Sequence, residues 1–125
     1  MAFPPESTEQ HRNRLRRNRR DYWWRHLAKR CLKRCPGSTI TEADILEIYA
    51  RQKGRCYWFG IHLVPSEQPR YPLSPSVDRL DHNLPYSREN AILVCFVANM
   101  GRNDNSVEVW KQFLIELKAS LTVTR

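Results

Sequence analysis

Three side chains in the second half of the chain could together bind a divalent metal ion. Asp78 stands at the end of a predicted strand, and Asn99 lies on a predicted helix that follows a return strand. A strand, a return strand and a helix can bring carboxylate and carboxamide oxygens together, and Mg²⁺ accepts both while keeping several waters. Asn103 would share the helix face of Asn99 and is a weaker third candidate. These residues predict a site for one Mg²⁺ or Mn²⁺ ion, to which a phosphate group would supply further ligands.

The elements that would position this site follow from apolar patterning. We expect a strand over residues 76–80, a turn over 81–85, a return segment over 86–95 and a short helix around 96–102. A longer helix should begin after Ser106 and bury one apolar face, made of Val109, Trp110, Phe113, Leu114, Leu117 and Leu121.

The first half of the chain adds more helix than strand. Residues 1–10 carry no apolar period and predict a disordered lead, and one amphipathic basic helix should run from about His11 to Cys35. Thr41 resembles the start of a capping box, so a second helix is expected there. Residues 56–64 are typical of a short hairpin or bent strand, and 65–75 of a proline-rich loop.

Charge is concentrated in the predicted basic helix. Eleven of the 21 Lys and Arg residues lie between Arg12 and Arg34, with one of the 13 Asp and Glu residues, although the whole chain carries a net charge of +8. Such a segment would release counterions from a polyphosphate, so double-stranded DNA, contacted mainly at its backbone, is the leading partner and an anionic membrane surface the second. No apolar run approaches the ~20 residues of a membrane span. The arginines expected to contact DNA are Arg12, Arg14, Arg16, Arg17, Arg19 and Arg20.

Length and cysteine content limit the class of protein. A chain of 125 residues suits one compact unit plus an appendage, here a lead and basic helix over 1–39 and a domain over 40–125. Four cysteines without a signal-peptide pattern predict reduced thiols in a cytoplasm-like compartment.

Several short motifs, in this order and spacing, resemble the HNH nucleases, also called His-Me finger or ββα-metal nucleases, and above all their small phage and homing-type members. The matching pieces are Cys56–Leu63 (CYWFGIHL), Pro75–Asp81 (PSVDRLD), Pro85–Tyr86 with Asn90, and Leu93–Asn99 (LVCFVAN) with Arg102. The resemblance spans about residues 40–105 and implies an α+β fold: a small ββα-metal core with flanking helices and the N-terminal basic helix.

The resemblance also implies a role for each matching position. Asp78 corresponds to the acidic metal ligand and Asn99 to the helix residue that completes the metal site. Asn90 corresponds to a structural residue that ties the loop between the strands by hydrogen bonds to backbone. Arg102 would face a DNA phosphate.

One departure from the family pattern concerns the general base. The residue after the metal-binding Asp is most often a histidine that deprotonates water, and here it is Arg79, which stays protonated at neutral pH. His82 and His62 are the imidazoles that could replace it, and Tyr57 and Tyr86 are weaker options because a phenol must first lose its proton. Arg79 itself could neutralise charge that develops on the phosphorane.

A second departure concerns zinc. Many relatives carry two C-x-x-C pairs, but here the partners of Cys56 and Cys95 are Phe59 and Ala98. A four-thiolate site would need Cys31 and Cys35, so structural Zn²⁺ is not expected, and buried thiols that act as small hydrophobes are preferred; all four cysteines are Cys31, Cys35, Cys56 and Cys95.

Three functions follow from these observations. The leading one is a metal-dependent DNA endonuclease or nickase that hydrolyses a phosphodiester and leaves a 5′ phosphate. The retained Asp78 and Asn99 favour it. The alternative is an HNH-fold nucleic-acid-binding module without catalysis, favoured by Arg79, and a third is a small basic adaptor in which Asp78 forms only a surface salt bridge. Target sequence and oligomeric state stay open.

Overall fold

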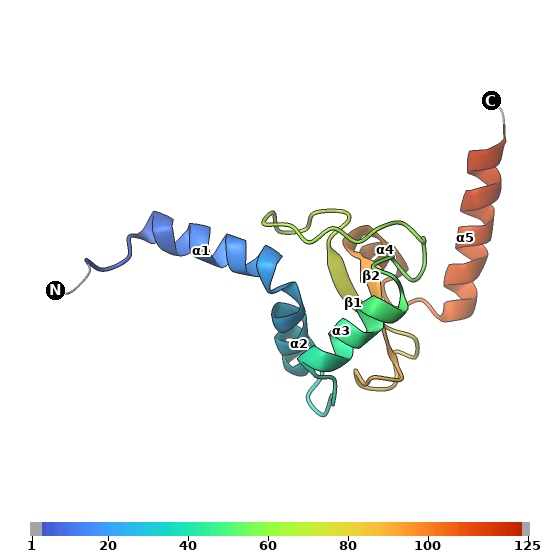
Figure 1. Ribbon diagram of the computed structural model, residues 1–125. Helices are drawn as coiled ribbons and strands as arrows, with labels where there is room; N and C mark the ends of the chain where they lie inside the picture. Colours follow the sequence, from blue (N-terminus) through green and yellow to red (C-terminus); the bar gives the residue numbers. More distant parts are fainter. Residues whose placement is uncertain (1–3, 124–125) are drawn as a thin grey trace.

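The computed structural model describes residues 4–123 and shows a small α+β domain (Figure 1). Within these residues, five helices accompany one two-stranded antiparallel sheet. The elements in chain order are α1 (Thr8–Asp21), α2 (Trp23–Arg34), α3 (Glu42–Arg51), β1 (Pro75–Arg79), β2 (Ala91–Cys95), α4 (Phe96–Arg102) and α5 (Val107–Thr122). No helix of the described part combines the length and apolar character needed to cross a bilayer.

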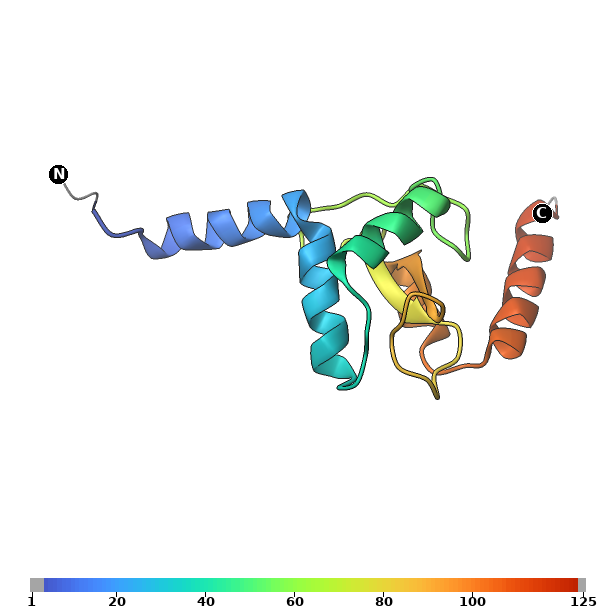
Figure 2. The ribbon, with the colours of Figure 1, turned by 60° about the horizontal axis from the view of Figure 1, so that its bottom comes forward.

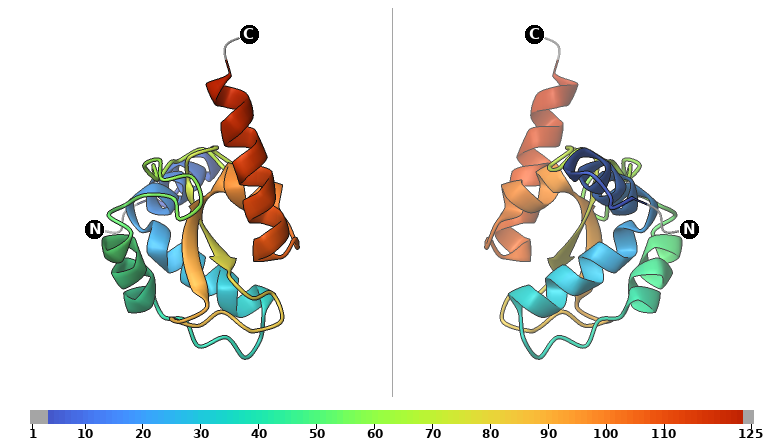
Figure 3. Two further views of the ribbon diagram at one scale, coloured as in Figure 1. Left: turned by 90° about the vertical axis from the view of Figure 1, so that its right-hand side faces the viewer. Right: turned by 90° about the vertical axis from the view of Figure 1, so that its left-hand side faces the viewer.

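The sheet is the centre of the molecule. β1 and β2 pair so that Asp78 lies opposite Ile92 and Arg79 opposite Ala91. All five residues of β2 are buried, which agrees with its continuous apolar sequence. α2 contacts β1, α3 contacts β2, and α4 follows β2 directly and contacts both strands (Figure 3). The strand, return strand and short helix predicted around Asp78 and Asn99 are therefore present.

The predicted single basic helix is two helices. The helix is interrupted at Tyr22, whose φ of −127° and ψ of 42° are not helical. α1, which precedes Tyr22, extends away from the rest of the domain (Figure 2). α1 has no buried residue, whereas α2 buries Trp23 and Leu27, so the apolar period starts only after the break. Trp23 lies in the core, as expected for an anchor.

The predicted disordered lead is also partly wrong. α1 begins at Thr8, where Ser7 and Gln10 form a reciprocal capping box that satisfies N–H groups of the first turn. Residues 1–3 of the predicted lead lie outside the described residues.

α3 begins as predicted. Thr41 accepts a hydrogen bond from the Asp44 N–H, and the Asp44 side chain accepts one from the Thr41 N–H. Ile45 and Ile48 bury the inner face. The turn after α3 ends at Gly54 with φ of 69°, where an added Cβ would lie 3.0 Å from the Tyr49 hydroxyl oxygen, so a side chain there would be strained and would displace Tyr49.

The segment after Gly54 forms the expected short hairpin, although its two arms pair over too few residues to count as strands. A single antiparallel bridge joins Arg55 and His62, and the N–H of Tyr57 donates to the Leu93 carbonyl of β2 at 2.9 Å. These bonds hold the turn beside the sheet and position Trp58.

The last helix does not bury the face that its sequence predicts. α5 starts at the Ser106 N-cap as expected, yet Trp110 is its only buried residue among those described. Leu114 packs against the core, while four side chains expected inside are exposed, namely Val109, Phe113, Leu117 and Leu121. α5 stands away from the sheet (Figure 1), and it reaches the core through Trp110, which lies against Phe59 and Gly101, and through Leu114.

Candidate functional site

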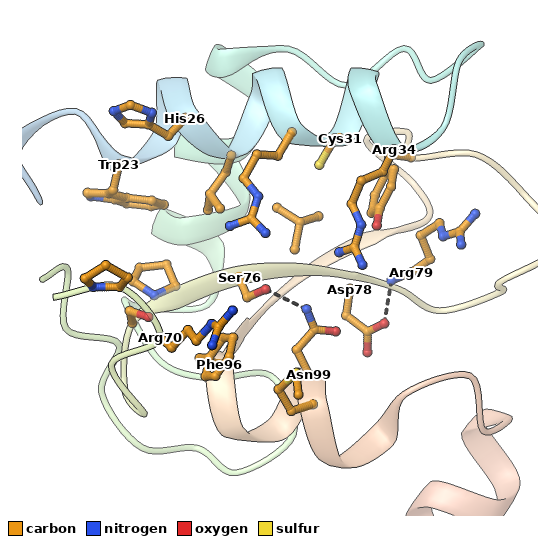
Figure 4. A pocket seen from close by; sticks show the side chains of 18 of the residues that line it. Trp23, His26, Cys31, Arg34, Arg70, Ser76, Asp78, Arg79, Phe96 and Asn99 are labelled. Atoms are coloured by element: carbon orange, nitrogen blue, oxygen red, sulfur yellow. Dashed lines mark hydrogen bonds between the residues drawn. The ribbon is translucent and has the colours of Figure 1, made fainter. Parts of the chain in front are cut away.

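A cleft of about 990 Å³ opens between α2 on one side and β1 with α4 on the other (Figure 4). The loop of residues 65–70 lines one end of it, and Asp78, His82 and Asn103 line the other. Asp78 and Asn99 are both directed into the cleft, and Arg34 of α2 faces them. Two residues that are 21 positions apart in the sequence are thus brought to one site, as the motif spacing predicts.

Asp78 is a buried carboxylate with four donors around it. Its side chain is 3% exposed. Oδ1 accepts the N–H of Arg79 at 2.8 Å and lies 3.2 Å from Nε2 of His82. Oδ2 accepts Trp58 Nε1–H at 3.1 Å and the Arg102 guanidinium at 2.8 Å. A carboxylate offers about four lone-pair positions, and backbone or side-chain N–H groups of Arg79, Trp58 and Arg102 fill three of them. Only the position that faces His82 could accept a metal ion.

Arg102 corrects one prediction. Its side chain is 1% exposed and does not face outward toward a DNA phosphate. Besides Asp78, its guanidinium donates to the backbone carbonyls of Arg79, Leu80 and Asn105. The sequence correctly predicts that Arg102 lies on the short helix α4. It does not reveal that the buried carboxylate of Asp78 in β1 pairs with this guanidinium.

Asn99 offers a free oxygen to the cleft. Its Nδ2 donates to Ser76 Oγ at 2.6 Å, which fixes the amide so that Oδ1 is the remaining polar atom. No hydrogen bond to that oxygen is found within residues 4–123. Asn103 also lines the cleft, but it follows the last residue of α4 and has φ of 51°, so it does not share a helix face with Asn99. Side-chain oxygens from β1 and α4 therefore line the same cleft.

The candidate imidazoles have different positions. His82 lines the cleft beside Asp78 and its side chain is 22% exposed. His62 is exposed, lies in the bridge with Arg55, and does not line the cleft. Of the two candidates, His82 is the one that the fold brings to Asp78.

The remaining candidates for proton transfer are less well placed. Arg79 lines the cleft, donates to the Leu84 carbonyl at 3.1 Å and stacks over the Tyr86 ring at 5.0 Å. Burial raises the pKa of Tyr86, which makes its phenolate harder to form. Tyr57 is exposed and outside the cleft. Neither tyrosine is suited to accept a proton from water at neutral pH.

Asn90 has the structural role expected of it. It is buried, and its Nδ2 lies within hydrogen-bonding distance of the carbonyls of Asp81, Leu84 and Pro85 at 2.9, 3.3 and 3.1 Å. Its Oδ1 accepts the N–H of Asp81. These bonds hold the turn that carries His82.

The predicted DNA-binding arginines divide into two groups. Arg14 pairs with Glu6 at 3.0 Å, and Arg20 pairs with Asp21 and Glu67 at 2.8 and 3.1 Å. The other four form no ion pair within the described residues, and they are Arg12, Arg16, Arg17 and Arg19. Arg12, Arg16 and Arg19 share one face of α1 by their i, i+4, i+7 spacing, and Arg19 lines the cleft. That face leads into the cleft.

Four basic side chains of the cleft were not among the site residues predicted from the sequence. Arg30 and Arg34 come from α2, where their spacing with His26 places all three on one face, and Arg70 comes from the loop. Burial, followed by the charges of Arg19 and Lys29, lowers the pKa of His26. The helical spacing could have identified the α2 residues, but no sequence signal brings Arg70 to the site.

The cysteines are arranged as two pairs. Cys56 and Cys95 are buried, and interaction with the Cys95 side chain lowers the pKa of Cys56. Cys31 is buried in α2, and burial raises its pKa to about 11, while Cys35 is half-buried at the end of that helix. Within the described part of the chain, no three His, Cys, Asp or Glu side chains gather closely enough to hold a metal ion by themselves.

No family model, curated protein or solved structure matches this chain. We therefore infer the function from the chemistry of the cleft.

Proposed function

We propose that this protein is an HNH-type endonuclease that hydrolyses DNA phosphodiester bonds with one Mg²⁺ or Mn²⁺ ion. The observation that carries the proposal is the meeting of Asp78 from β1 and Asn99 from α4 in a cleft lined by arginines. Consecutive β1, β2 and α4 would be the ββα-metal core that the motifs imply.

The residues of the cleft suit the ion in number and kind. Asp78 Oδ1 and Asn99 Oδ1 are hard oxygen ligands, and the ion would polarise the scissile phosphate and the departing 3′ oxygen. Ser76 holds the Asn99 amide through its hydrogen bond, so the amide oxygen needs no reorientation.

The arginines of the cleft would bind and orient the substrate. Arg30, Arg34 and Arg70 line its walls and would contact phosphates on either side of the scissile bond. The face of α1 that carries Arg12, Arg16 and Arg19 would continue these contacts along the backbone. α1 spans about 21 Å at 1.5 Å per residue, which is enough to follow several phosphates.

A plasmid assay tests the proposal. Supercoiled plasmid is incubated with the full chain and Mg²⁺ or Mn²⁺, and we expect nicking that Asn99→Ala abolishes. Gln112→Ala is the matched control and should keep the nicking, because Gln112 is an exposed amide of α5 that does not line the cleft. Nicking that survives Asn99→Ala, or absent nicking with either metal by a folded wild-type chain, contradicts the proposal. Asp78→Ala is unsuitable, since Asp78 also pairs with Arg102 inside the fold.

One observation favours a second function, a nucleic-acid-binding module without catalysis. The charge of Asp78 is already balanced by the buried Arg102, and three of its four acceptor positions are taken by N–H groups. For this function we expect DNA binding in the plasmid assay with no nicking under Mg²⁺ or Mn²⁺, and no change in binding on Asn99→Ala.

A further inference from the structure

We propose that Nε2 of His82 is a third ligand of the divalent ion, together with Asp78 and Asn99. The inference rests on the proposed function and makes it more specific, because it assigns His82 to the metal and removes it from the candidates for general base. The sequence alone indicates His82 for proton transfer only.

The distance between the two groups fits a shared ion. Oδ1 of Asp78 and Nε2 of His82 lie 3.2 Å apart. Ligands about 2.1 Å from an octahedral ion and adjacent to each other are about 3 Å apart. A divalent ion can therefore replace the proton between these two atoms with only a small rotation of the imidazole.

The surroundings of Asp78 direct the ion to this place. The Arg79 N–H occupies the second position of Oδ1, and Trp58 and Arg102 occupy Oδ2. All three are obligatory donors, so none of them can give way without leaving a buried N–H unpaired. An ion can therefore take only the position on Asp78 Oδ1 that faces His82.

The fold also holds His82 in place. The turn that carries it is fixed by the bonds of Asn90 to Asp81, Leu84 and Pro85. The imidazole is 22% exposed, so one side is packed while the ring still borders the cleft. A ligand on such a turn needs little reordering to bind.

A nitrogen ligand changes the metal preference. Imidazole suits Mn²⁺, Co²⁺ and Ni²⁺ better than Mg²⁺, and affinity should rise in the order Mn²⁺, Co²⁺, Ni²⁺. Because Arg102 balances the charge of Asp78, the site attracts a cation weakly without DNA. We therefore expect the free protein to bind these transition ions more tightly than Mg²⁺, which should bind only weakly.

Pulsed electron paramagnetic resonance of the full chain with Mn²⁺ alone tests the inference. We expect nitrogen hyperfine coupling of a directly bound imidazole in wild-type protein and in the control His62→Ala. The coupling should vanish in His82→Ala, with Mn²⁺ affinity by calorimetry about tenfold or more lower. His82→Gln keeps a hydrogen-bonding group near Asp78 and protects the test against a folding defect.

The outcomes separate the two proposals. Bound Mn²⁺ without nitrogen coupling, or coupling that persists in both His82 variants, overturns the role of His82. Nicking that still depends on Asn99 would in that case leave the nuclease standing. Mn²⁺ binding that neither Asn99→Ala nor His82→Ala weakens overturns both proposals, because the ion would then lie elsewhere.

Discussion

At the scale of single residues, Asp78 has two tasks that conflict. It is an oxygen ligand of the proposed site, and it is also the counter-charge of a guanidinium with 1% exposure. Removing one member of such a buried pair leaves the other charge without compensation, which costs far more than breaking an exposed pair. Loss of activity on changing Asp78 would therefore report the fold as much as the chemistry.

We predict that Asp78→Asn lowers the free energy of unfolding by about 3 to 5 kcal/mol, because Arg102 stays buried without its counter-charge. Urea unfolding measures the change. Arg88→Met is the control, since Arg88 pairs with Glu47 at the surface, and it should cost about 1 kcal/mol or less. Equal losses in the two variants would contradict the structural role of the Asp78–Arg102 pair. The double variant Asp78→Asn/Arg102→Met should lose less than the sum of the two single variants.

A second prediction concerns Asn90. Asn90→Asp should destabilise the protein by about 2 kcal/mol or more, because a carboxylate cannot donate to the three carbonyls that the Asn90 amide contacts. Chemical denaturation checks this result. Asn83→Asp, in the same turn but exposed, should be nearly neutral. A neutral Asn90→Asp would mean that the turn does not depend on these bonds.

At the scale of elements, the sequence predicted those features that depend on residues close together in the chain, such as helix starts. The capping box at Thr41 and the cap at Ser106 marked helix starts correctly, because a cap is a contact between residues three apart. The break at Tyr22 was missed, since basic residues continue through it and no Gly or Pro marks it. The apolar face of α5 was correctly seen but wrongly assigned to the core, because periodicity does not say what covers a face.

The site shows the same division. The motifs predicted that Asp78 and Asn99 lie at one site, and both line the same cleft. They also identified Asn90 as the residue that holds the turn. The burial of Arg102 and the arrival of Arg70 from the loop depend on contacts between distant segments. No pattern within one segment carries that information.

A prediction follows for α5. Ending the chain after Leu114 removes residues that are exposed, including Ile115, Leu117 and Leu121, so the free energy of unfolding should change by about 1 kcal/mol or less. Ending the chain before Trp110 should destabilise strongly, since Trp110 is buried against Phe59 and Gly101. Thermal unfolding compares the two truncations. A large loss of stability on ending the chain after Leu114 would show that the exposed face of α5 is covered in solution.

At the scale of the whole molecule, the pKa of His26 makes stability depend on pH. Burial lowers that pKa below its ordinary value of about 6.5, so the unfolded chain binds the proton more readily. The folded state is therefore destabilised as the pH falls through about 6.5, and the penalty is absent above it. His26→Gln should flatten the loss of stability between about pH 7 and 5, as measured by urea unfolding at each pH. An unchanged slope would contradict this effect of burial.

Because some arginines of α1 pair with acids and others do not, a prediction follows for the proposed DNA-binding surface. Arg16→Ala/Arg19→Ala removes two cations that form no ion pair among residues 4–123, so the slope of log affinity against log salt should fall by up to about 2 units, roughly 0.9 for each phosphate that is no longer neutralised. Arg14→Ala/Arg20→Ala removes the same charge, but from side chains that already pair with acids, and should change the slope by less than about 0.5 units.

Fluorescence anisotropy with a duplex over a salt series measures both slopes. Equal effects in the two double variants would mean that DNA responds to the total charge of α1 and not to the face that leads into the cleft. A larger effect of Arg14→Ala/Arg20→Ala would mean that the DNA contacts α1 mainly outside the face that carries Arg12, Arg16 and Arg19. Because Arg19 lines the same cleft as the proposed metal site, an effect confined to Arg16→Ala/Arg19→Ala would mean that the bound backbone passes over that site.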